Sequence, residues 1–262
     1  IAFLLAAGGM LLLSGCGSDG IVFNGQAQIE QFPVRKIPVV PRALMLAELM
    51  RLKQGVAIAG THGKTTTTSM IGHILDQCGL DPTVIIGGRV LSERTGASLG
   101  TGQYVVAEAD ESDGSFLKCA PYGAIVTNVE AEHLDQWKSV ERLKEAFEEF
   151  FTHVEGPLVL CADDPFLQGR QGITYGFSSS AQHQVTDFQQ EGFSIRFHLN
   201  SHTLSLPLIG RHNALNGAAV FLLCRELGLS VAAIQEAFST FPGVARRLEK
   251  KGEVRGALFF DD

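Results

Sequence analysis

Residues 56–66 read VAIAGTHGKTT, and this stretch decides the fold. The run at 56–59 is apolar and predicts a buried strand, and the apolar spacing after Lys64 predicts a helix to about Cys78. A glycine-bearing loop between a strand and a helix is typical of a phosphate-binding loop, because backbone N–H groups and the helix N-terminus attract phosphate oxygens. A glycine turn that only caps the helix is the alternative. The standard pattern places glycine where Ile58 stands, so this loop is a variant.

The loop supplies the first candidate site residues. We predict that it binds nucleotide phosphate through Gly60, Thr61, His62, Gly63, Lys64, Thr65 and Thr66. Lys64 is expected to reach the β- and γ-phosphates as a catalytic residue, and the Thr65 hydroxyl is expected to bind magnesium. The glycines are needed because a side chain would keep the backbone away from the phosphates.

Short apolar and β-branched runs recur along the chain without polar alternation, as expected for strands covered on both faces. After residues 56–59 they occur at 83–86, 104–107, 124–127 and 158–161, with several shorter strands between about 173 and 208. Helices are predicted near residues 64–78, 139–154, 213–227 and 231–238. Strands that alternate with helices predict a right-handed, doubly wound, mostly parallel α/β sheet.

The first 55 residues are less regular and predict part of a small α/β unit. We expect a helix tail, strands at about 11–14, 21–23 and 37–40, and a helix that Pro41 opens and that runs to about Lys53. Residues 1–16 can also be read as a signal segment that ends in Leu-Ser-Gly-Cys. Against this, no Lys or Arg precedes Arg35, whereas a signal peptide needs a positively charged start. The apolar run is also too short to cross a bilayer as a helix.

Charge and cysteine content argue against some classes of function. Asp and Glu number 28 against 21 Lys and Arg, a formal net charge of -7, so nucleic acid is not an expected partner. The cysteines are scattered and form no Cys-x-x-Cys pair, which argues against a zinc knuckle or a redox motif. Such a set suits the reducing cytoplasm.

Three further blocks follow predicted strands or open a predicted helix. They read EADESDGSF at 108–116, TNVEAEHLD at 127–135 and GRHNALN at 210–216. Because the carboxyl ends of parallel strands meet at one edge of a sheet, Glu108 can hold magnesium beside the phosphate loop. His133 is a candidate for ligating a second metal or positioning the γ-phosphate. A solvated acidic loop and a structural histidine are the respective alternatives.

The phosphate loop and these blocks, in this order, resemble the Mur ligase family, and within it the ligases that join L-alanine to UDP-N-acetylmuramate. The resemblance covers residues from about 37 to 262 and implies ATP and Mg2+ as cofactors. It implies that Lys64, Glu108 and His133 are catalytic and that Thr65, Glu108 and His133 contact the metal.

The same resemblance implies the rest of the ATP site. His212, Asn213 and Asn216 would line the pocket for the base and ribose, although Asn213 could instead cap the helix. Arg247 and Asp262 would complete the ATP site from a third domain.

The resemblance also implies three parts of the chain. Residues 1–50 are expected to be a partial, Rossmann-like domain that binds the UDP-sugar. Residues 51–244 are expected to form the central ATP-binding domain, which contains the phosphate loop. Residues 245–262 are expected to begin a C-terminal ligase domain that is largely absent.

The implied reaction is ATP-dependent amide ligation in cytoplasmic peptidoglycan precursor synthesis. ATP would phosphorylate the lactyl carboxylate of UDP-N-acetylmuramate, and the amine of L-alanine would then displace phosphate from the acyl phosphate. No membrane insertion is expected, and the oligomeric state cannot be predicted.

Three alternatives stay open. One is a ligase that attaches a whole peptide to the same sugar nucleotide, in which the resemblance implies tyrosine where Ser112 stands. Another is an enzyme similar to folylpolyglutamate synthetase. The third is a nucleotide-binding module without catalytic activity.

Overall fold

A computed structural model describes residues 2–6, 10–14, 41–86, 96–244, 249–254 and 257–261. The strands expected at 21–23 and 37–40 lie outside the described residues. No helix within the described ranges is long and apolar enough to cross a membrane.

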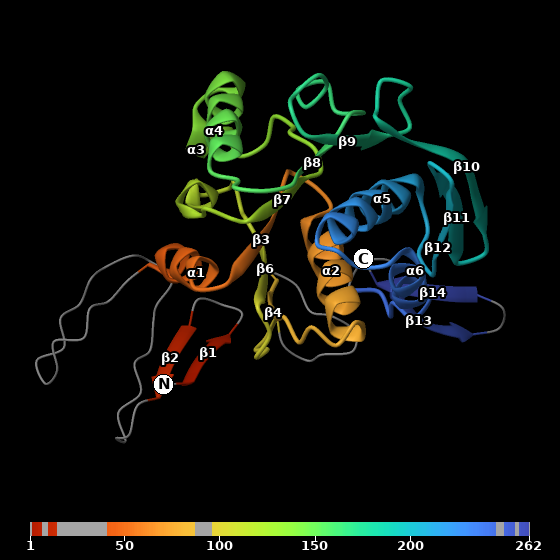
Figure 1. The fold of residues 1–262 in the computed structure, drawn as a ribbon, viewed down its shortest axis with the longest axis horizontal. Coiled ribbons are helices and arrows are strands. Elements are labelled where there is room, and N and C mark those ends of the chain that lie inside the picture. Colours follow the sequence, from red (N-terminus) through yellow and green to blue (C-terminus); the bar gives the residue numbers. More distant parts are fainter. Residues whose placement is uncertain are drawn as a thin grey trace, which may run out of the picture.

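The main sheet contains 10 strands within the described residues, in the order β12-β11-β10-β9-β8-β7-β3-β6-β4-β5 (Figure 1). Their bounds are β3 Gln54–Ala59, β4 Thr83–Ile85, β5 Ala97–Ser98, β6 Tyr104–Glu108, β7 Gly123–Val126, β8 Leu158–Cys161, β9 Ile173–Gly176, β10 His183–Glu191, β11 Ser194–Leu199 and β12 His202–Leu206. Neighbours from β4 to β10 run parallel, and β5, β11 and β12 pair antiparallel. The predicted mostly parallel α/β sheet is therefore confirmed.

The central strands are buried because helices cover the sheet on both sides. Every residue of β7 is buried, as are all residues of β3 after Gln54. The helices α2 (Lys64–Gln77), α5 (Arg211–Glu226) and α6 (Val231–Ser239) contact one another on one face. On the other side lie α1 (Arg42–Arg51) and α4 (Val140–Thr152), as Figure 1 shows. Both helices contact the short 3-10 helix η1 (Ser115–Lys118). Such coverage explains why the strand sequences lack polar alternation.

The amphipathic helix predicted at 139–154 is α4. The Ser139 hydroxyl caps it by accepting from the Arg142 N–H at 3.3 Å. The rings of Phe147 and Phe150 are fully buried and lie 5.0 Å and 5.2 Å from the ring of Phe116. This aromatic cluster attaches α4 to η1, and hence to the acidic block that precedes η1.

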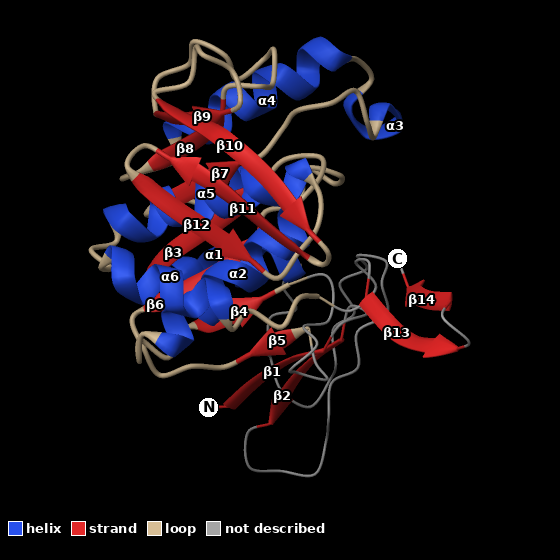
Figure 2. Cartoon of the chain, turned by 90° about the vertical axis from the view of Figure 1, so that its right-hand side faces the viewer, coloured by secondary structure: helices blue, strands red, loops and turns tan. Residues whose placement is uncertain are grey.

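The N-terminal prediction is partly wrong. Ala2–Ala6 forms strand β1 instead of a helix tail, and it pairs antiparallel with β2 (Met10–Ser14). The strand expected at 11–14 is confirmed as β2. The helix expected from Pro41 is also present, although Pro41 is the residue before its first turn. A second antiparallel pair, β13 (Glu249–Val254) and β14 (Ala257–Asp261), lies near the C-terminal end (Figure 2).

Candidate functional site

Three adjacent parallel strands bring the loops of the candidate site to one edge of the sheet. Strand β3 lies between β6 and β7 and pairs parallel with both. The phosphate loop, the acidic block and the block that begins at Thr127 therefore leave the sheet at the same edge. The carboxyl edge of a parallel sheet, where connections diverge to either side, is where such folds bind ligands.

The phosphate loop depends on two glycines in the left-handed region. Gly60 has a φ of +122° and Gly63 a φ of +87°, and Gly63 directly precedes the first turn of α2. A Cβ at Gly60 would lie only 2.3 Å from the Thr127 hydroxyl oxygen. No side chain caps the described N-terminus of α2, which leaves it able to receive an anion. The predicted strand–loop–helix arrangement is confirmed.

The loop is held by the block that follows β7. The Thr61 N–H donates to the Asn128 carbonyl at 3.1 Å, and the His62 N–H donates to Asn128 Oδ1 at 2.8 Å. In return, the Thr127 hydroxyl and the Asn128 amide both donate to the His62 carbonyl, at 2.6 Å and 3.2 Å. These bonds fix the loop before any ligand arrives. No role was predicted for Thr127 or Asn128, although both stand in the block at 127–135.

The His62 side chain takes no part in the hydrogen bonds described above. It is exposed, and its Nε2 lies 3.7 Å from a Glu130 carboxylate oxygen and 3.5 Å from one of Glu132. Only the backbone of His62 therefore takes part in shaping the loop.

Lys64 lies in the loop with its ammonium group largely buried. Its Nζ donates to the Gly60 carbonyl at 2.7 Å and to Glu111 Oε2 at 2.8 Å, and it lies 3.8 Å from an Asp110 oxygen. The exposed fraction of the side chain is 13% for Lys64 and 2% for Glu111. Glu111 is thus the carboxylate that contacts the loop lysine, a contact that was not predicted.

Glu108 and His133 occupy the predicted edge of the sheet. Glu108 is the last residue of β6 and is half-buried. His133 is exposed, has a φ of +53° and precedes α3 (Leu134–Trp137). The Trp137 indole N–H donates to the Glu111 carbonyl at 2.9 Å, which ties α3 to the acidic block. The catalytic and metal-binding roles of Glu108 and His133 stay predictions.

The third block lies against the phosphate loop. A Cβ at Gly63 would be 2.8 Å from Asn216 Oδ1, so the start of α5 packs directly on the start of α2. The Asn216 amide donates to Asn213 Oδ1 at 3.2 Å, and the Asn213 amide donates to the Ile209 carbonyl at 2.8 Å. Asn213 therefore does not cap α5, whose N-cap is Gly210.

The remaining predicted nucleotide contacts are only partly placed. His212 is exposed in the first turn of α5, and its ring lies over Gly210. Arg247 and Asp262 lie outside the described residues, so their predicted part in the ATP site remains a prediction.

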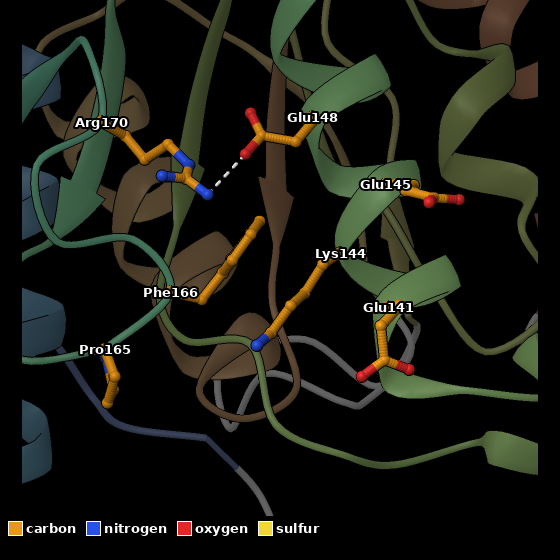
Figure 3. Close-up of a pocket in the computed structure, with 7 residues that line it drawn as sticks. All are labelled: Glu141, Lys144, Glu145, Glu148, Pro165, Phe166 and Arg170. Carbon is orange, nitrogen blue, oxygen red and sulfur yellow. Dashed lines mark ion pairs between the residues drawn. The ribbon is translucent and has the colours of Figure 1, made fainter.

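A separate pocket lies between α4 and the loop after β8 (Figure 3). The Arg170 guanidinium forms an ion pair with Glu148 at 2.6 Å and lies over the Phe166 ring, 4.5 Å from its centroid. Lys144 approaches the same ring at 5.6 Å. No predicted site residue lines this pocket, so it is distinct from the phosphate loop.

Comparisons with known proteins agree with this architecture. The UDP-N-acetylmuramate--L-alanine ligase of Geotalea uraniireducens is 47% identical over 257 residues, which cover 92% of this chain and 56% of that protein. The crystal structure of UDP-N-acetylmuramate-alanine ligase from Thermotoga maritima is 31% identical with a TM-score of 0.76, covering 83% of this chain and 52% of that one.

A ligase for a longer substrate is also similar. The UDP-N-acetylmuramate:L-alanyl-gamma-D-glutamyl-meso-diaminopimelate ligase from Neisseria meningitides is 26% identical with a TM-score of 0.70, covering 80% of this chain and 73% of that one. The chain spans about half the length of the curated relatives it matches. A family model described as the Mur ligase middle domain matches residues 58–224, which is more than half of the chain. With its phosphate loop, its acidic block and most of α5 inside that match, the chain belongs to the Mur ligase family.

Proposed function

We propose that this chain is the ATP-binding part of a cytoplasmic enzyme that joins L-alanine to UDP-N-acetylmuramate through an acyl phosphate. The observation that carries the proposal is the position of Lys64, whose largely buried ammonium group lies at the start of α2, directly after a loop with two glycines at positive φ. The choice of L-alanine is supported by relatives named UDP-N-acetylmuramate--L-alanine ligase at 45% to 48% identity.

The protein contributes binding, orientation and charge to this reaction, and no covalent nucleophile is required. The α2 N-terminus and the loop N–H groups bind the phosphates, and Lys64 offsets negative charge on the transferring phosphoryl group. The lactyl carboxylate attacks the γ-phosphorus and releases ADP. The amine of L-alanine then attacks the acyl carbon, and inorganic phosphate leaves. Holding these groups in line is the main catalytic contribution.

The residues present fit Mg2+ bound together with ATP. Thr65 and Glu108 offer oxygen donors, which this hard cation prefers, and they would hold it beside the phosphates. His133 offers nitrogen, a donor better suited to other metals, so its part as a ligand is the weaker prediction. Among the described residues no three His, Cys, Asp or Glu side chains gather to hold a metal. Mg2+ often takes only one or two carboxylates, because phosphate and water complete its shell. When bound, it would neutralise charge on the β- and γ-phosphates.

The position of Asn216 is a second argument for a nucleotide site at the phosphate loop. Asn216 lies on the phosphate loop at Gly63, with Asn213 one hydrogen bond away. We propose that these residues and His212 form one wall of the pocket for the base and ribose. The UDP-sugar contacts expected from residues 1–50 remain a proposal based on the family.

The function is tested by substrate choice. A version of the chain extended to the length of its relatives should release phosphate and form amide only with MgATP, UDP-N-acetylmuramate and L-alanine. A tripeptide in place of L-alanine, or a folate with glutamate, should give little product. Faster ligation of the tripeptide would indicate the peptide-attaching enzyme, and phosphate binding without product from any set would indicate a module without catalytic activity.

The magnesium assignment makes a separate prediction. Glu108→Gln removes a hard anionic ligand while keeping the side-chain shape, so the Mg2+ concentration for half-maximal activity should rise about tenfold or more. ATP affinity at saturating Mg2+ should change little. The measurement is a magnesium titration of amide formation. An unshifted curve for Glu108→Gln beside a shifted one for Glu111→Gln would mean that Glu111 is the ligand.

A further inference from the structure

The lysine of the phosphate loop contacts a buried carboxylate, that of Glu111. Glu111 lies in the turn after β6, and its side chain is only 2% exposed. Its Oε2 accepts from Lys64 Nζ at 2.8 Å, whereas its Oε1 is buried without a hydrogen-bond partner. Burying a carboxylate lowers the stability of the fold unless both of its oxygens are paired or hydrogen-bonded. A residue with a purely structural role would therefore be poorly suited to this position.

The geometry around Nζ shows what Glu111 does to the lysine. An ammonium group has three N–H donors. The Gly60 carbonyl and Glu111 Oε2 accept two of them at 2.7 Å and 2.8 Å, and Asp110, at 3.8 Å, is too distant for a hydrogen bond. One donor therefore remains for a phosphate oxygen. Lys64 can engage a nucleotide without leaving Glu111, with its direction already fixed.

The backbone of Glu111 is itself held firmly. Its carbonyl accepts from the Trp137 indole N–H at 2.9 Å and from the Gly114 N–H at 3.2 Å. The Trp137 ring packs edge-on against Phe116, with 6.1 Å between the ring centroids. The aromatic cluster of α4 and η1 therefore holds Trp137, Trp137 holds the Glu111 backbone, and the Glu111 carboxylate holds the Lys64 ammonium group.

We propose that Glu111 is a positioning residue that aligns the Lys64 ammonium group for the transferring phosphoryl group. This inference rests on the proposed function, since it concerns the same phosphate site. Prealigned charge accelerates the chemical step because no reorganisation is needed as charge develops. Glu111 acts through Lys64 and does not touch the nucleotide. It also repels the phosphates at close range, so it contributes to rate and not to nucleotide affinity.

The test compares Glu111→Gln with wild type in the version of the chain extended to the length of its relatives. Glutamine keeps the shape and removes the charge. We expect kcat to fall about tenfold to a hundredfold, in line with the cost of misplacing a catalytic group. The Kd for MgATP should stay unchanged or become tighter, and the magnesium midpoint should not move. Asp113→Asn is the matched control, because it removes a charge from the same segment at an exposed side chain that bonds only the Ser115 N–H in the described structure.

Three other outcomes for Glu111→Gln would overturn the inference. A folded Glu111→Gln protein with wild-type kcat would make Glu111 a structural residue. Equal losses in kcat and MgATP affinity would make it a contributor to binding, and a shifted magnesium midpoint would make it a metal ligand. Wild-type protein that neither binds MgATP nor forms amide would instead reject the proposed function.

A second variant covers the case in which Glu111→Gln does not fold. Trp137→Phe removes the hydrogen bond to the Glu111 carbonyl and keeps an aromatic ring against Phe116. It should lower kcat several-fold with an unchanged Kd for MgATP. Wild-type kcat in Trp137→Phe, together with a Glu111→Gln protein that cannot fold, would count against a positioning role.

Discussion

Replacing Lys64 with alanine should reduce amide formation by about a thousandfold or more, because it removes the charge that faces the transferring phosphoryl group. The measurement is single-turnover amide formation with MgATP in the version extended to the length of its relatives. Activity near that of wild type in a folded variant would contradict the proposed role of the phosphate loop.

The same substitution should also lower stability, which the sequence did not indicate. The structure shows a side chain that is 13% exposed and paired with the buried Glu111. Removing one partner of such a pair leaves an uncompensated buried charge, at a cost of about 3–5 kcal/mol.

The double variant Lys64→Ala/Glu111→Gln separates the two effects. It removes both charges, so it should recover most of the stability lost in the single variant while remaining inactive. Denaturant unfolding of wild type, both single variants and the double variant gives the coupling energy of the pair. Stability losses that simply add would show that the two residues do not interact as described.

Gly60→Ala should abolish measurable MgATP binding. The new Cβ would lie 2.3 Å from the Thr127 hydroxyl oxygen and 2.8 Å from the Asn128 carbonyl oxygen, at a φ of +122° that L side chains rarely adopt. The loop must move, and the bonds from Thr127 and Asn128 that shape it are lost. Isothermal titration calorimetry with MgATP measures the binding, and denaturant unfolding measures the stability.

Gly79→Ala is the matched control for this experiment. Gly79 also has a positive φ, +72°, but a Cβ there would meet nothing within 4 Å. It should therefore show only the backbone cost, about 1–2 kcal/mol, with unchanged MgATP binding. Equal effects of the two substitutions on binding would mean that the close approach at Gly60 is unimportant.

Much of the fold could be predicted from local sequence. The helix predicted at 64–78 is observed as Lys64–Gln77, and the strand predicted at 158–161 is observed as Leu158–Cys161. Long helices carry a spacing of apolar residues that no strand shares, and buried parallel strands are short apolar runs between glycine-containing turns. The same information placed the phosphate loop, because a strand, two glycines, a lysine and a helix start follow one another directly.

The N-terminal residues show where local patterns fail. Ala2–Ala6 is a short, uniformly apolar run, and such a run has no periodicity that separates a helix from a strand. Its strand conformation comes from pairing with Met10–Ser14, a partner that the run itself does not specify.

Family membership, the elements of the central sheet and the lysine of the phosphate loop could all be predicted from the sequence, since each depends on patterns among residues that are close together in the chain. The groups that surround that lysine could not, because they come from distant parts of the chain that meet only after folding. Glu111 is 47 residues from Lys64 in sequence, and Asn128 is 66 residues from His62. The acidic block offers Glu108, Asp110, Glu111 and Asp113 as similar carboxylates. Which of them meets the ammonium group depends on how the turn after β6 directs each side chain, and that direction is set by packing against α3, η1 and the loop after β3.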